Sequence, residues 1–283
     1  MHTMQEFLLW SNCTNQCAFC WQCKKKDATT FLNEAEMLEC VNKTIAMLDT
    51  INDGDDVLLV GGEILAPYHE SVNIALQSLI NKCVAMVEST QIRYLYINTN
   101  LIYTDRMNLD YLLAKMRGME YRLKFTTSFD IYGRFRSDRE RDIFLSNLAY
   151  IRDNYPNVNV VVNSIITKQL VNSDFYFDAF QEEYKIKYIN FIPYIPVQDD
   201  RSMDVEFRDI VKILARNERK HKGFINFYIN DLDLNQNKKL YEYHKGVGYT
   251  ECTSRYSECH HNENFKKVLG DECYICKLKD LFQ

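Results

Sequence analysis

Val57-Leu58-Leu59-Val60-Gly61-Gly62-Glu63 is the stretch that best indicates the fold class of this chain. Four apolar residues run without interruption, after an Asp-rich turn and before a pair of glycines. Strands of parallel sheets are buried on both faces and have such continuous apolar runs, whereas half-exposed strands alternate. The stretch therefore predicts a buried parallel strand that ends at a tight turn.

Similar short β-rich runs recur outward from this stretch, and each is followed by a segment with helical periodicity. The expected strands are Phe7–Trp10, Val57–Val60, Tyr94–Ile97, Leu123–Thr127, Val158–Val162 and Tyr188–Ile192. The expected helices cover residues 34–50, 72–87, 109–116, 138–152, 175–184 and 205–220. Repeated βα units with right-handed crossovers curl into a barrel or part of one. We therefore expect an α/β fold, a partial (β/α)6 barrel over residues 1–223.

Two of these helices have clear sequence patterns. Asn33 is expected to cap the first, whose apolar face carries Leu38, Val41, Ile45 and Leu48. The apolar face of the second carries Val72, Leu76, Leu79, Cys83 and Val87. Cys40 and Cys83 are expected to be buried as small apolar side chains of these helices.

The alternation stops after about Gly223. Residues 224–283 contain one more strand-like stretch, Phe224–Ile229, then a polar segment rich in Asn and Lys, then four cysteines. We expect these residues to form a small cysteine-rich C-terminal extension that binds metal.

Composition excludes several classes of protein. The 283 residues are 46% hydrophobic and 26% charged, which is typical of a globular protein and argues against disorder. The net charge of −5 provides no basic surface for charge-driven nucleic-acid binding. No apolar run approaches the roughly 18 residues of a membrane span, and no secretion signal is evident. We therefore expect a cytoplasmic protein.

The ten cysteines indicate metal or redox chemistry, because a chain of this length without a signal peptide has little use for many disulfides. Cys13, Cys17 and Cys20 have the spacing C-x3-C-x2-C, which lets three thiolates converge on one iron–sulfur cluster. Three ligands on a [4Fe–4S] cluster leave one iron open, as a catalytic metal site requires. Cys23 is an alternative fourth ligand that would close the cluster, but Phe19 and the motifs downstream favour the open site.

The C-x3-C-x-aromatic-C pattern, with Phe19 as the aromatic, resembles the signature of the radical S-adenosylmethionine (radical SAM) superfamily. Gly61-Gly62-Glu63 resembles the GGE motif of that family, whose backbone and acid hold the methionine ammonium of S-adenosylmethionine. The physical reason is that glycine allows close backbone approach and a carboxylate pairs with an ammonium. Ile64 stands where the family usually has proline.

Weaker matches follow each of the next three strands. The turn Ile97–Asn100 resembles the TNG motif of the family, and its Asn98 is the expected cofactor contact. Asn100 stands where glycine is common, and asparagine and glycine both tolerate a positive φ. The end of the fourth strand, Thr127–Asp130, resembles the SxD motif, whose serine, here Ser128, contacts the carboxylate or ribose of S-adenosylmethionine. Asn163, after the fifth strand, is where the family has a polar contact to the ribose. In the family, an arginine some residues after the SxD motif often adds a bidentate contact to the cofactor. Of Arg134, Arg136, Arg139 and Arg141, we choose Arg136.

The resemblance covers about residues 5–200. It implies that S-adenosylmethionine binds the open iron and is cleaved on one-electron reduction, and that the 5′-deoxyadenosyl radical abstracts hydrogen from a substrate. Such an oxidoreductase needs a flavodoxin-like or ferredoxin-like reductant. A peptide or protein substrate is expected by analogy with members that have cysteine-rich extensions. The alternatives are a nucleotide or other small-molecule substrate, or a non-catalytic zinc-binding interaction protein.

The C-terminal cysteines predict a second metal site. Its expected ligands are Cys252, Cys259, Cys273 and Cys276, a closed four-thiolate set. His260 and His261 would favour zinc, whereas the family resemblance favours a second [4Fe–4S] cluster. The extension has few apolar residues, so the metal is also expected to hold it folded.

Overall fold

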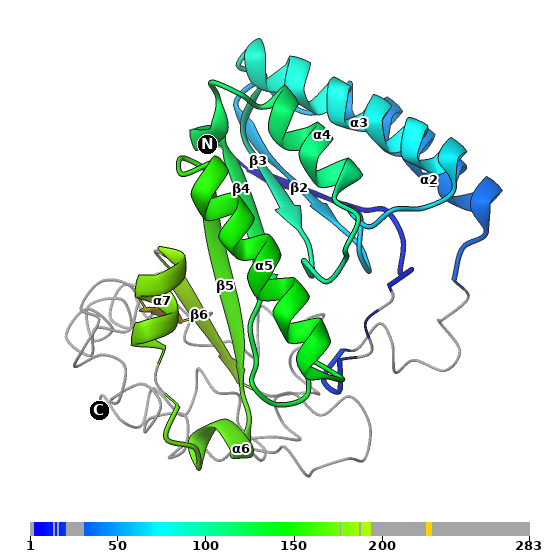
Figure 1. Ribbon diagram of the computed structural model, residues 1–283. Helices are drawn as coiled ribbons and strands as arrows, with labels where there is room; N and C mark the ends of the chain where they lie inside the picture. Colours follow the sequence, from blue (N-terminus) through cyan, green and yellow to red (C-terminus); the bar gives the residue numbers. More distant parts are fainter. Residues whose placement is uncertain are drawn as a thin grey trace, which may run out of the picture. The chain divides into compact units, whose positions relative to one another are not determined.

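Strands and helices alternate along the chain in the computed structural model (Figure 1). The structure describes residues 3–13, 15, 17–20, 31–175, 177–186, 188–193 and 225–227. The chain divides into two compact units. The first consists of Met1–Cys17, Gln22–Ser128 and Phe135–Val161, and the second of Ala18–Trp21, Phe129–Arg134 and Val162–Gln283. The expected α/β class is confirmed.

The core of the first unit is a parallel sheet. Its strands are β1 (Met4–Leu8), β2 (Asp55–Val60), β3 (Ile92–Asn98) and β4 (Leu123–Ser128), which pair in chain order. The register aligns Leu59 of β2 with Ile97 of β3, and Ile97 with Phe125 of β4. All three side chains are at most 2% exposed, so one continuous apolar row crosses the sheet. The ends of parallel strands meet at one edge, which brings the following turns together.

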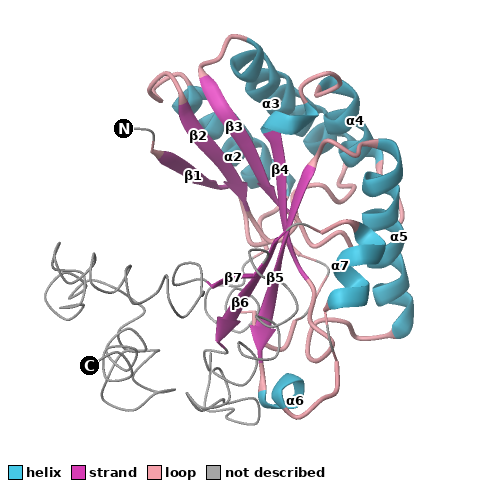
Figure 2. Cartoon of the chain, turned by 90° about the vertical axis from the view of Figure 1, so that its left-hand side faces the viewer, coloured by secondary structure: helices cyan, strands magenta, loops and turns pink. Residues whose placement is uncertain are grey.

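Four helices cover one face of this sheet (Figures 1 and 2). They are α2 (Glu34–Leu48), α3 (Glu70–Glu88), α4 (Met107–Lys115) and α5 (Asp138–Asn154). Burial alternates along β4, where Leu123, Phe125 and Thr127 are buried and the residues between them are half-buried. The helix layer therefore packs against every second side chain of the strand.

The helix patterns are confirmed in part. Asn33 caps α2 through a capping box with Glu36, and the five expected apolar positions of α3 are all buried. The expected face of α2 is partly wrong: its buried residues are Met37, Val41, Thr44 and Leu48. Leu38 and Ile45 are half-buried, because the stripe that faces the core is rotated by one position. Cys40 lies at the edge of that stripe and is half-buried, whereas Cys83 is buried as expected.

The bounds of the first strand differ from the prediction Phe7–Trp10. β1 begins earlier because its ladder with β2 runs from Met4, opposite Asp56, to Leu8, opposite Val60. The apolar residues that suggested a later strand are buried beyond its end, and the Leu9 N–H still donates to the Val60 carbonyl at 3.0 Å. Pairing with the neighbour, rather than apolarity, sets the limits of this strand.

In the second unit, the parallel strands β6 (Tyr188–Pro193) and β7 (Ile225–Phe227) pair with each other. β5 (Asn159–Ile166) starts in the first unit and ends in the second. Two helices follow β5: α6 (Lys168–Val171), which the sequence did not predict, and α7 (Asp178–Tyr184). The expected helix 205–220 and the four C-terminal cysteines lie outside the described residues. None of the helices that the structure describes is long and apolar enough to cross a membrane.

Candidate functional site

The cysteine segment leaves the end of β1 and is hydrogen-bonded to the backbone that follows β2. The Gly62 N–H donates to the Trp10 carbonyl at 2.7 Å, and the Glu63 N–H donates to the Asn12 carbonyl at 2.9 Å. The Trp10 indole N–H donates to the Glu63 carbonyl at 3.2 Å from a position that is 2% exposed. These contacts hold the start of the cysteine segment against the Gly-Gly-Glu turn.

The approach of the chain's own backbone requires glycine at position 62, and a side chain at position 61 would meet Ile64. A Cβ on Gly62 would lie 2.3 Å from the Asn12 carbonyl oxygen and 2.5 Å from that of Ser11. A Cβ on Gly61 would lie 2.8 Å from the Ile64 Cγ2 atom. The close approach argued from the sequence is therefore present, but the described partner is the cysteine segment. That Gly61 and Gly62 also contact S-adenosylmethionine stays a prediction.

The Glu63 carboxylate lies at the centre of a buried hydrogen-bond network. It is 1% exposed and accepts from the Leu65 N–H at 2.8 Å and from the Thr99 hydroxyl at 2.9 Å. The Asn100 N–H donates to its other oxygen. Charge-assisted bonds of this kind stabilise a buried carboxylate. Glu63 thus joins the turn after β2 to the turn after β3, and its expected contact with an ammonium stays a prediction.

The turn after β3 has a different geometry from the one expected. The left-handed conformation, which asparagine would tolerate at position 100, occurs at Leu101, with a φ of 56°. The Asn100 side chain forms a bridge instead: its oxygen accepts from the Ile102 N–H at 2.6 Å, and its amide donates to the Cys13 sulfur at 3.4 Å. Asn98, at the end of β3, is half-buried.

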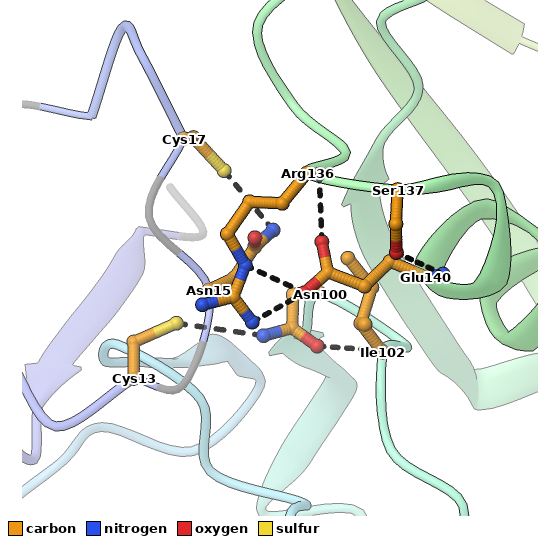
Figure 3. Close-up of polar contacts among 8 residues, drawn as sticks. All are labelled: Cys13, Asn15, Cys17, Asn100, Ile102, Arg136, Ser137 and Glu140. Carbon is orange, nitrogen blue, oxygen red and sulfur yellow. Dashed lines mark hydrogen bonds and ion pairs between the residues drawn. The ribbon is translucent and has the colours of Figure 1, made fainter.

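Two thiols face polar donors in the first unit (Figure 3). Cys13 and Cys17 are half-buried and are not in disulfide bonds. The Asn15 amide donates to the Cys17 sulfur at 3.1 Å, as the Asn100 amide does to Cys13. N–H donors of this kind stabilise a thiolate.

Arg136 approaches the same two sulfurs from the segment before α5. Its guanidinium Nε atom donates to Glu140 at 2.6 Å, and its backbone N–H donates to the other oxygen of Glu140 at 2.8 Å. The hydrogen bond to Glu140 raises the pKa of Arg136, and the negative potential of the Cys13 and Cys17 thiolates raises it further. Arg136, the arginine chosen from the sequence, therefore lies beside two of the proposed cluster ligands (Figure 3). Arg134 is buried in the second unit near Asp130.

The chemistry of these residues fits an iron–sulfur cluster. Cys20 is a half-buried thiol of the second unit, and Phe19 beside it is also half-buried. Within the described residues, no three His, Cys, Asp or Glu side chains converge on one metal position. The donor set nevertheless consists of three thiols on a short segment, with N–H donors and a guanidinium beside two of them. Such surroundings favour the thiolate state that iron requires.

Sequence reasoning missed Asp130 as a titrating group of the second unit. Its carboxyl is 3% exposed, and one oxygen accepts from the Ser164 hydroxyl at 3.4 Å. Burial raises the pKa of Asp130 to about 7, although Arg134 opposes the shift. The signal was present in the motif Ser128–Asp130, where only the serine was chosen. Ser128 is half-buried at the end of β4, and the carbonyl of half-buried Asn163 accepts from the Phe129 N–H at 2.8 Å.

Comparison with solved structures finds similar folds. SuiB of Streptococcus suis bound to S-adenosylmethionine matches with a TM-score of 0.55 and 16% identity, over 80% of this chain and 50% of SuiB. Histidine-tagged anSMEcpe with bound AdoMet matches with a TM-score of 0.55 and 12% identity, over 80% of this chain and 62% of that one. SuiB bound to its precursor peptide SuiA matches with a TM-score of 0.53 and 16% identity, over 80% and 49%.

At these identities the likeness shows the fold. The chain spans about half the length of SuiB, at 50%, and 62% of anSMEcpe. No family model and no curated protein sequence matches the chain.

Proposed function

We propose that this protein is a radical SAM enzyme, in which Cys13, Cys17 and Cys20 hold a [4Fe–4S] cluster with one open iron. The observation that carries the proposal is the pair of backbone hydrogen bonds between the cysteine segment and the Gly-Gly-Glu turn. They bring two motifs of one family together, although the bonded residues Asn12 and Glu63 are 51 positions apart in the sequence. Two of the similar solved structures contain S-adenosylmethionine, the cofactor that the sequence resemblance implies.

The residues of the first unit have distinct proposed roles. When bound, the cluster supplies the electron that cleaves S-adenosylmethionine. Asn15 and Asn100 stabilise the thiolates through their amides, and Arg136 adds positive charge beside them. Glu140 orients the Arg136 guanidinium, whose planar donors suit the carboxylate of S-adenosylmethionine. Ser128, Asn98 and Asn163 are proposed polar contacts of the cofactor, and Phe19 lines it.

For the substrate, we propose a peptide or protein. SuiB, one of the similar structures, is bound to a precursor peptide. The C-terminal extension 224–283 is proposed to hold a second [4Fe–4S] cluster or zinc through Cys252, Cys259, Cys273 and Cys276. A small-molecule substrate is the alternative that the substrate test distinguishes.

The test is anaerobic reconstitution of the full chain, with measurement of iron, sulfide and zinc and of 5′-deoxyadenosine released under a strong reductant. We expect iron, sulfide and cleavage in the wild type. Cys17→Ala should abolish cleavage, because it removes a cluster ligand. The matched control Cys40→Ala, which removes a half-buried thiol from α2, should retain it.

A zinc-only protein that leaves S-adenosylmethionine intact would contradict the proposal and support a zinc-binding interaction protein. For the substrate, deuterated candidate peptides should transfer label into 5′-deoxyadenosine. Label from small molecules, with none from peptides, would reject the peptide assignment and leave the enzyme assignment standing.

A further inference from the structure

We propose that Asn100 raises the reduction potential of the cluster by donating a hydrogen bond from its side-chain amide to the Cys13 sulfur. The inference rests on the proposed function, since it needs a cluster at Cys13. Its structural basis is the Nδ2-to-Sγ distance of 3.4 Å between a residue of the turn after β3 and a residue of the cysteine segment (Figure 3). Asn100 acts on the cluster through Cys13 and is therefore a positioning residue.

The orientation of the Asn100 amide is determined by a backbone donor. The Ile102 N–H donates to the Asn100 side-chain oxygen at 2.6 Å. An N–H can only face the oxygen of the amide, so the NH2 group must face the other way, toward Cys13. The reversed amide would place two donors against each other and the oxygen against sulfur.

The turn that carries Asn100 is held from several sides. The Asn100 N–H donates to Glu63, and the Leu101 N–H donates to the Thr99 hydroxyl at 3.2 Å. From α5, the Asn147 amide donates to the carbonyls of Leu101 at 3.0 Å and Tyr103 at 2.8 Å. With Asn100 only 8% exposed, the donor has little freedom to turn away from the sulfur.

The direction of the effect follows from charge. One-electron reduction adds a negative charge that is shared with the cysteine sulfurs, so an N–H dipole aimed at a sulfur stabilises the reduced state more than the oxidised state. Hydrogen bonds to sulfur are among the factors that set iron–sulfur potentials. Burial reduces the solvent screening of this interaction. A glycine, which is common at this place in the resembled family, has no such donor.

The experiment is an EPR-monitored redox titration of the reconstituted full chain. Asn100→Ala removes the donor and should make reduction about tenfold less favourable, a negative shift of about 59 mV for a one-electron couple. The matched control is Asn108→Ala: Asn108 is also buried, but its amide donates to the Ala66 carbonyl and the Asn73 side-chain oxygen. Its cluster potential should equal that of the wild type.

An unchanged potential in Asn100→Ala, at wild-type iron content, overturns the inference and leaves the proposed function intact. If that variant loses iron, Asn100→Gly, which also lacks a side-chain donor, replaces it and the same shift is expected. ENDOR with 15N-labelled asparagine side-chain amides provides an independent measurement: Asn15 and Asn100 should both couple to the reduced cluster in the wild type, and only Asn15 in the Asn100 variant. Equal nitrogen coupling in the wild type and the Asn100 variant also overturns the inference. Absence of any cluster in the wild type defeats the proposed function itself and the inference with it.

Discussion

The Thr99 hydroxyl donates to both carboxylate oxygens of Glu63, at 2.9 and 3.0 Å, and so connects the turns that follow β2 and β3. Both side chains are buried, at 5% and 1% exposed. The same carboxylate accepts from the backbone of Leu65 and Asn100. Glu63, which the sequence predicts to bind S-adenosylmethionine, therefore also holds together the turns beside the cysteine segment.

Glu63→Gln should destabilise the chain even in the absence of S-adenosylmethionine. The amide presents an NH2 group to donors that now face a carboxylate, and each lost charge-assisted bond contributes about 1.5–3 kcal/mol. Urea unfolding measures the effect. Glu39→Gln is the control, because Glu39 forms an exposed pair with Lys43 on α2, and its unfolding midpoint should not change. On the reconstituted protein, calorimetry should show S-adenosylmethionine binding weakened about tenfold to a hundredfold. Equal unfolding midpoints for wild type and Glu63→Gln would contradict the structural role.

Gly62→Ala should reduce the iron content of reconstituted protein severalfold. The new Cβ would lie 2.3 Å from the Asn12 carbonyl oxygen, so the cysteine segment must move away from the turn after β2. Gly118→Ala is the control: no atom lies within 4 Å of its Cβ, although its φ of +85° makes alanine strained. That strain should lower stability without loss of iron. Iron loss in both variants would mean that destabilisation alone, and not displacement of the cysteines, is responsible.

Arg136→Ala should weaken S-adenosylmethionine binding about tenfold, the value of one charge-assisted hydrogen bond at a half-exposed site. Glu140→Gln should weaken it less, because Arg136 keeps its charge and loses only its orientation. Isothermal titration calorimetry of the reconstituted protein measures both. The control is Arg141→Ala, which removes a pair with Asp138 on the same helix. Equal affinities of the wild type and Arg136→Ala for S-adenosylmethionine would contradict this role and indicate that another arginine contacts the cofactor.

Asp130 should make stability depend on pH. Burial raises its pKa to about 7 in the folded chain, above the ordinary value of 3.8, so the folded state binds the proton more tightly. The contribution of the protonated Asp130 to the free energy of unfolding is fully present below about pH 4 and is lost as pH rises through 7. The free energy of unfolding falls by no more than about 1.4 kcal/mol per pH unit over this interval. Asp130→Asn should flatten the dependence of the unfolding midpoint over this interval. Asp53→Asn, at an exposed position, should leave the profile unchanged, and an Asp130→Asn profile as steep as the wild type would refute the assignment.

The alternation of strands and helices could be predicted from the sequence because it is encoded locally. Apolar runs such as Val57–Val60 and the periodic face of α3 need no knowledge of distant residues. The Asn33 cap is likewise decided within one turn of helix. The cysteine spacing and the glycine pair also lie within short stretches of sequence, so the candidate site could be predicted from them.

The remaining features depended on partners far along the chain. The limits of β1 were set by its ladder with β2, and the buried stripe of α2 by the surface it covers. No local pattern shows that Asn100 reaches Cys13 across 87 positions, or that Leu101 takes the positive φ. The sequence by itself determined which residue types follow each strand. Only the tertiary structure decided their hydrogen-bond partners, because a buried donor or acceptor must be satisfied by whichever group the packing brings within reach.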